Sequence, residues 1–328
     1  MIKNTEYDIE VYRFKKRSKE SLFHIFKWLL IIGLAYVIIY PIIQLIIPSI
    51  THIQDVDDPA VIWVPSNITF KTILVAYNQL QYLSTLAITV LYTVVLVVIQ
   101  TFISSFVGYA FARFDFPLKK FWTVLLLLTM VIPYFAIEMS TRYHYTNFDF
   151  LGIISLFNGG EPINLLNKPF VYILINLFGQ GLKGGLFIYV FIKFYSSIPE
   201  ELEESALVDG CGFFKIYTNI ILPNAKPAII TCIVLSFVWN YGDYQNSQLF
   251  NNDMQLLSNV MLRNIATITN IPTAVKNVYL IPGSSVTEMM IGAVQNAAIL
   301  LFMLPLIIFY LVIQRKFTEN FERSGIVG

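Results

Sequence analysis

The sequence predicts an all-α polytopic membrane protein with about six transmembrane helices, and three observations lead to that fold class. Hydrophobic residues make up 56% of the 328 residues and charged residues only 13%, whereas soluble domains carry about 25% charged residues. Several apolar runs are long enough to cross a hydrocarbon core of ~30 Å, which takes about 20 helical residues. Basic residues gather in alternate segments between these runs, as they do in membrane proteins of fixed orientation.

Six spans are predicted from the apolar runs. They are Trp28 to Ile47, Leu83 to Val107, Phe121 to Ile137, Phe170 to Tyr195, Ala228 to Trp239 with its flanks, and Met289 to Ile313. The fourth run is interrupted by glycines and by Lys183. We count it as one span, although the interruption also fits an external turn that precedes a shorter span.

The spans divide the chain into segments. Residues 1–27 form a polar leader, and because no small-residue cleavage site follows the first apolar run, residues 28–50 are expected to remain as the first span. An external segment is expected at 51–82, a core of five spans at 83–313 with an external segment at 243–288, and a tail at 314–328. With six spans both termini lie on one side, and the basic residues place that side in the cytoplasm of a cell-membrane protein.

Residues 196–224 predict two short helices that meet at Gly210, and we call this stretch the elbow. A serine can cap the first helix, Pro199 suits its first turn, and carboxylates follow at the positive end of the helix dipole. The second helix is amphipathic, with apolar positions at Phe213, Phe214, Ile216, Tyr217 and Ile220. An aromatic face is unfavourable in water, so the elbow is expected either in a groove of a partner protein or on a lipid surface.

The elbow resembles the EAA loop in the membrane permease subunits of ATP-binding-cassette importers. The matching residues are Glu204, Ser205, Ala206, Gly210, Ile220, Leu222 and Pro223, with Ser205 in place of the first alanine of the motif. Three further stretches resemble the sugar-importer branch of the family, which includes the second permease of maltose-type systems. They are residues 108–114, 198–204 and 235–240, and the terminal residues 325–328 also look like that branch.

This resemblance implies a permease subunit for a sugar or oligosaccharide, with the cytoplasmic two-helix elbow coupling it to ATPase subunits. The implied coupling residues are Glu204, Ser205, Ala206, Asp209, Gly210, Phe213, Phe214 and Tyr217. The implied partners are a second permease subunit in a heterodimer, two ATP-binding subunits and an extracytoplasmic substrate-binding protein. The chain lacks a GxxxxGK[ST] phosphate loop, so it is not expected to be an enzyme, and ATP hydrolysis is expected in a partner.

Polar and aromatic side chains beside the spans are candidates for contact with the cargo, because sugars are bound by aromatic faces and by hydrogen bonds. The candidates are Tyr134, Glu138, Asn240, Tyr241 and Asp243. Charged groups deep in a membrane are rare and functional, but an interfacial aromatic belt also explains the tyrosines.

No metal or cofactor is expected. The residues that bear on this are His24, His52, His144, Cys211 and Cys232, which lack ligand spacing and are interpreted as structural. The net charge of +1 gives no basic field for nucleic acid. An ion-coupled secondary transporter remains the alternative, since Glu138 and the interrupted fourth span fit that class as well.

Overall fold

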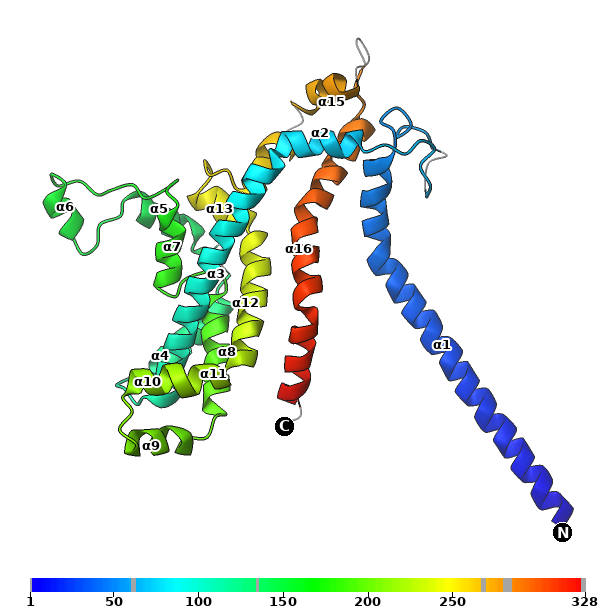
Figure 1. Ribbon diagram of the computed structural model, residues 1–328, viewed down its shortest axis with the longest axis horizontal. Helices are drawn as coiled ribbons and strands as arrows, with labels where there is room; N and C mark the ends of the chain where they lie inside the picture. The colour runs from blue at the N-terminus through cyan, green and yellow to red at the C-terminus, as the bar shows by residue number, and fades with distance from the viewer. Residues whose placement is uncertain (1, 60–62, 134–135, 267–269, 280–284, 326–328) are drawn as a thin grey trace. The chain divides into compact units, whose positions relative to one another are not determined.

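The computed structural model describes residues 2–59, 63–133, 136–266, 270–279 and 285–325 (Figure 1). These residues are helical apart from connecting segments and two isolated β-bridges, Thr51–Ile68 and Phe148–Ile163. The all-α prediction is therefore confirmed. The chain forms two compact units: residues 1–76 with 271–300, and residues 77–270 with 301–328.

The first unit contains α1 (Ile2–Ile50), the start of α2 (Lys71–Leu80), α15 (Ile271–Tyr279) and the start of α16 (Glu288–Gly325). The predicted polar leader is continuous with the first span in α1. No glycine or proline occurs before Gly33, and the lysines, arginines and glutamates of the leader favour a helix. A buried hydrogen bond of 2.7 Å between the hydroxyls of Thr72 and Tyr279 joins α2 to α15.

The second unit is built around α3 (Tyr82–Arg113), which packs against α7 (Phe170–Leu177), α8 (Gly184–Ser196) and α12 (Lys226–Tyr241). Its remaining helices are α4 (Lys119–Val131), α5 (Glu138–Thr146), α6 (Ile153–Phe157), α9 (Glu201–Val208), α10 (Phe213–Ile216), η2 (Tyr217–Ile221), α11 (Leu222–Asn224), α13 (Tyr244–Phe250), α14 (Leu257–Val260) and η3 (Met261–Ala266). In Figure 1, α9 and α10 lie at one end of α3, and α5 and α13 lie toward the other.

Within the described residues, three helical segments are long and apolar enough to cross a membrane: Glu20–Ile50, Tyr82–Arg113 and Glu288–Arg315. A fourth span results if 213–224 and α12 count as one helix bent by 76°. These segments correspond to the predicted first, second, sixth and fifth spans. A polytopic membrane protein is thus what the structure describes.

The predicted third and fourth spans are shorter helices. The third, α4, ends at Val131, because Ile132 adopts an extended backbone before Pro133. The fourth is broken between α7 and α8. Gly179 and Lys183 both adopt positive φ there, and the exposed Lys183 directly precedes α8.

Close packing of α3 on α8 depends on Gly108. A Cβ atom at this position would lie 2.5 Å from the Cβ of Phe191. We therefore expect Gly108→Ala to lower the free energy of unfolding by about 1–3 kcal/mol, the usual range for overpacking. The midpoint of thermal unfolding in detergent measures this change.

The matched control is Gly33→Ala in α1, where an added Cβ meets no atom within 4 Å. Alanine is the better helix former, so this variant should unfold at the same or a higher temperature. Equal midpoints for Gly108→Ala and the parent would contradict the packing argument.

Candidate functional site

The two helices of the elbow meet at a glycine turn. Gly210 has φ +78°, a left-handed conformation that favours glycine. The amide of Cys211 donates to the carbonyl of Ala206 (2.9 Å), and the amide of Gly210 donates to the carbonyl of Leu207 (3.0 Å). This is the Schellman pattern that ends a helix, so the turn at Gly210 has the geometry that the sequence predicts.

The start of the elbow differs from the prediction in one respect. Within the described residues no serine caps α9, which begins after Glu200. The hydroxyls of Ser196 and Ser197 donate instead to the carbonyls of Ile192 and Phe194 in α8. The predicted carboxylates do occupy the first turn of α9, where the helix dipole stabilises negative charge.

The elbow has an inner face that is buried against the spans and an outer face that is exposed. Of the predicted coupling residues, Ala206 and Tyr217 are buried in a hydrophobic cluster with Tyr195 of α8 and Ala228 of α12. The others are exposed: Glu204, Ser205, Asp209, Gly210, Phe213 and Phe214. Leu207 and Val208 add to this exposed surface. The predicted set therefore divides into residues that fix the elbow and residues that are free to meet a partner.

Polar contacts also hold the elbow to α3, and sequence reasoning missed them. Arg113, the last residue of α3, forms an ion pair with Glu203. The hydroxyl of Ser105 is 2.6 Å from that of Tyr195 and 2.8 Å from that of Tyr217. Arg113 lies in a stretch that the family resemblance included, but nothing in the sequence pairs it with Glu203.

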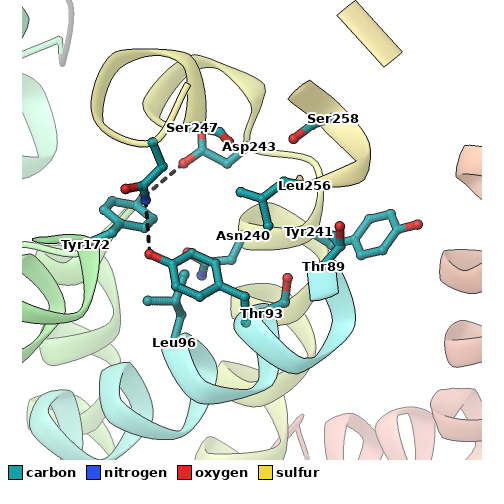
Figure 2. A pocket seen from close by; sticks show the side chains of 12 residues that line it. Thr89, Thr93, Leu96, Tyr172, Asn240, Tyr241, Asp243, Ser247, Leu256 and Ser258 are labelled. Carbon is teal, nitrogen blue, oxygen red and sulfur yellow. Dashed lines mark hydrogen bonds between the residues drawn. The ribbon is translucent and has the colours of Figure 1, made fainter. Parts of the chain in front are cut away.

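A small polar cavity lies between α3, α7, α12 and the residues after α12 (Figure 2). Its lining includes Thr89, Tyr92, Thr93, Tyr172, Asn240, Tyr241, Asp243, Ser247, Asn251 and Ser258. The cavity volume of about 20 Å³ is enough for about one water molecule. In this conformation the cavity is therefore too small for a sugar.

The structure brings together three of the five predicted cargo residues, Asn240, Tyr241 and Asp243, at this cavity. Glu138 is half-buried at the start of α5 and is not part of the lining, and Tyr134 lies outside the described residues. The aromatic-belt explanation is wrong for Tyr241, which is buried and donates a hydrogen bond to the carbonyl of Phe302 (3.1 Å). Tyr92 and Tyr172 were missed because they lie on helices that only the fold brings to the cavity.

Asp243 caps α13 and is the charged group of the cavity. One carboxylate oxygen accepts from the amide of Asn246 (3.1 Å), and the other accepts from the Asn246 side chain (2.7 Å) and from the hydroxyl of Tyr172 (2.8 Å). Burial raises the pKa of Asp243 above its ordinary value, although these hydrogen bonds act in the opposite direction.

A buried polar network lies next to the cavity. The amide nitrogen of Gln100 donates to the carbonyl of Leu182 (2.6 Å), and its oxygen accepts from Asn240 (3.1 Å) and from Ser236. Gln100 thus joins α3 and α12 to the break between α7 and α8. The Oδ1 atom of Asn240 is buried and has no partner among the described residues.

Comparison with known proteins identifies the family. Residues 100–319 match the family described as the binding-protein-dependent transport system inner membrane component. The chain belongs to this family. It is therefore an integral membrane component of a transport system, as the resemblance of the elbow implied, and no finding supports the ion-coupled alternative.

Individual relatives have similar lengths. The galactooligosaccharides transport system permease protein GanQ of Bacillus subtilis (strain 168) is 25% identical over 93% of this chain and 95% of GanQ. The maltodextrin transport system permease protein MalD of Streptococcus pneumoniae (strain R6) is 22% identical over 96% of this chain and 98% of MalD. A solved bacterial ABC transporter that imports the acidic polysaccharide alginate has the same fold, with a TM-score of 0.61 and 21% identity over 91% of this chain and 98% of that chain.

The Gln100 network predicts a stability effect. Gln100→Leu leaves the Leu182 carbonyl and the Asn240 amide without this partner, and hydrogen bonds inside membrane proteins contribute about 1 kcal/mol. We expect a lower midpoint of thermal unfolding in detergent. The matched control is Thr101→Val on the same helix, because the buried Thr101 hydroxyl has no partner among the described residues. Equal losses in both variants would contradict the role of Gln100.

Proposed function

We propose that the chain is the permease subunit of an ATP-driven importer for a sugar or oligosaccharide, and that the elbow couples it to separate ATPase subunits. The cargo class rests on the relatives, which include permeases named for galactooligosaccharides and maltodextrin. ATP hydrolysis is assigned to partners because the sequence lacks a phosphate loop.

The observation that carries the coupling role is the exposed outer surface of a firmly seated elbow. Val208 is 88% exposed and Phe214 is 71% exposed, although Ala206 and Ile216 of the same two helices are buried. Large apolar side chains are unfavourable in water, so these exposed residues favour docking of the elbow in the groove of a partner protein.

The charge of the elbow argues against a lipid surface as the docking site. α9 carries the exposed Glu201 and Glu204, and the exposed Asp209 follows it. The cytoplasmic leaflet is anionic and attracts basic segments rather than acidic ones. A protein groove with basic residues is the better match.

The orientation is also part of the proposal. Arg113 ends α3 where the elbow lies, and Lys119 of α4 and Lys215 of α10 follow at the same end. Asp149 and Asp253 follow α5 and α13 at the other end. The positive-inside rule therefore supports an elbow in the cytoplasm. The even number of spans predicted from the sequence implies that both chain termini share that side.

The remaining partners are a second permease subunit, in a heterodimer, and an extracytoplasmic substrate-binding protein. The polar cavity beside Asn240 admits only about one water molecule, which supports a path that this chain shares with a second permease subunit. Asn240, Tyr241 and Asp243, together with Tyr134 and Glu138, are proposed to border that path.

The coupling role is tested by capture of the ATPase. We expect a tagged chain, solubilised gently from native membranes, to copurify with an ATPase and a second permease. The combined variant Glu204→Lys and Phe214→Asp should retain the permease and lose at least about tenfold of the ATPase, as expected when exposed anchor residues of an interface are changed.

The matched control is Leu156→Asp in α6, an exposed apolar residue at the opposite end of the spans. This variant should keep the ATPase. Equal ATPase recovery from the parent and the elbow variant would contradict docking through the elbow.

The cargo path is tested by uptake in proteoliposomes that hold the complex, with labelled maltotriose and galactotriose as probes. Asp243→Asn should lower uptake several-fold, because an amide cannot accept all the hydrogen bonds that the carboxylate accepts. Asp253→Asn, at an exposed position nearby in the chain, is the control. Uptake that survives ATP depletion but stops with an uncoupler would favour an ion-coupled carrier instead.

A further inference from the structure

Arg113 contacts α9 and the segment before it through all three of its guanidinium nitrogens. The guanidinium Nε is 2.5 Å from one oxygen of Glu203, and the hydroxyl of Tyr109 donates to the other oxygen (2.8 Å). A second guanidinium nitrogen donates to the carbonyl of Ile198 (2.6 Å), and the third lies 3.4 Å from Glu200. One side chain at the end of α3 therefore holds the segment before α9 and the first turn of α9 together.

This contact is partly removed from water. The side chains of Arg113 and Glu203 are 7% and 13% exposed. Such a pair is favourable only when its geometry is good and its remaining polar atoms have hydrogen-bond partners, and both oxygens of Glu203 do. Glu204, the next residue, is exposed. Of these neighbouring glutamates on α9, Glu203 is thus held against α3 and Glu204 faces outward.

The second helix of the elbow is fixed to the same helix, α3. Ser105 holds Tyr217 of the elbow and Tyr195 of α8 through hydroxyl contacts that are fully buried. Ser105 lies about 12 Å along α3 from Arg113, at 1.5 Å per helical residue. Each of the two short helices of the elbow therefore has its own polar attachment to α3.

We propose that Arg113 and Glu203 are positioning residues that lock the elbow to α3, so that a displacement of the elbow by the ATPase moves α3. The inference rests on the proposed docking of the elbow and adds the route by which the movement enters the spans. The route continues along α3 to Gln100, which holds Asn240 of the cavity and Leu182 at the break between α7 and α8. Coupling through packed helices and buried hydrogen bonds of this kind needs contacts that stay closed while the parts move.

The test measures the response of α3 to ATP and needs no cargo. An environment-sensitive fluorophore is attached to Phe102→Cys, a half-exposed position on α3 between Gln100 and Arg113. The background carries Cys211→Ser, and the buried Cys232 is left in place. The labelled chain is used in the complete complex with its ATPase, and the fluorescence change on adding ATP and vanadate is recorded together with the rate of ATP hydrolysis.

Glu203→Gln removes the charge and keeps the size of the side chain. We expect this variant to retain the ATPase and its hydrolysis rate, and to lose about tenfold of the fluorescence response per bound ATPase, within the usual range of coupling between sites. The charge-swapped pair Arg113→Glu with Glu203→Arg should recover part of the response. Tyr109→Phe removes one hydroxyl contact to Glu203 and should give a smaller loss.

The matched control is Lys119→Gln. Lys119 forms an ion pair of 3.4 Å with Asp115, whose side chain is fully exposed, close to the same end of α3. This pair joins residues four apart in the chain and does not contact the elbow, so its loss should leave the fluorescence response unchanged. A similar loss in Lys119→Gln and Glu203→Gln would show a general charge effect and would overturn the proposal.

Two other outcomes also overturn it. A full response in both Glu203→Gln and Tyr109→Phe would mean that the lock does not transmit movement. Loss of the ATPase from Glu203→Gln would mean that Glu203 belongs to the docking surface. If Glu203→Gln fails to accumulate in the membrane, the fluorescence response of Tyr109→Phe alone decides whether the lock transmits movement. Failure of the proposed function looks different, because the parent complex itself would then hold no ATPase or give no response to ATP.

Discussion

The structure of the second unit depends on one constraint: polar groups buried among the spans need partners within the protein, because the hydrocarbon core offers no water, and among the described residues few such side-chain atoms lack one. α3 carries most of these groups on one face, among them Thr89, Gln100 and Ser105. The hydroxyl of Thr89 accepts from the amide of Leu257 (2.7 Å), Gln100 reaches two other segments, and Ser105 reaches two tyrosines. Three of the helices that pack on α3, namely α8, α12 and α14, are therefore placed by a polar contact as well as by packing.

The same constraint explains how a broken span is tolerated. A helix that stops between Leu177 and Gly184 frees backbone carbonyls, and such breaks occur in membrane proteins only where protein groups satisfy the freed atoms. Gln100 accounts for one of them, the carbonyl of Leu182. Gly181 leaves the room this needs, since a Cβ there would overlap the side chain of Asn176. The break between α7 and α8 is thus stabilised by specific contacts, and it lies beside the Gln100 network that reaches Asn240.

The sequence predicts the parts of this structure that local chemistry determines. The elbow could be predicted from Pro199, the carboxylates of α9 and Gly210, because these residues signal the start and the end of a helix. The second span could be predicted because its apolar run is long and lacks breakers. The ends of α4 and α7 could not be predicted as well. Apolar residues continue past Ile132 and Leu177, but the helical backbone conformation does not.

The site was less predictable than the fold for a related reason. Asn240, Tyr241 and Asp243 were found because they follow one another at the end of a span, whereas Tyr92 and Tyr172 come from other helices. Arg113 and Glu203 are 90 residues apart in the chain, so their pairing is a property of the fold alone. The family resemblance covered both residues without linking them. Contacts between elements therefore needed coordinates, even where each element was expected.

The division between the two faces of α9 has a geometric origin. Successive helical residues are about 100° apart around the helix axis, at 3.6 residues per turn. Glu203 can then point toward α3 while Glu204 points away from it, and Ala206 is small enough to let the helix approach the spans. A bulky residue at 206 would push α9 away from α3 and lengthen the contact of Glu203 with Arg113. The small residue of the motif and the buried ion pair are therefore two parts of one attachment, and the exposed glutamate beside them is left available to a partner.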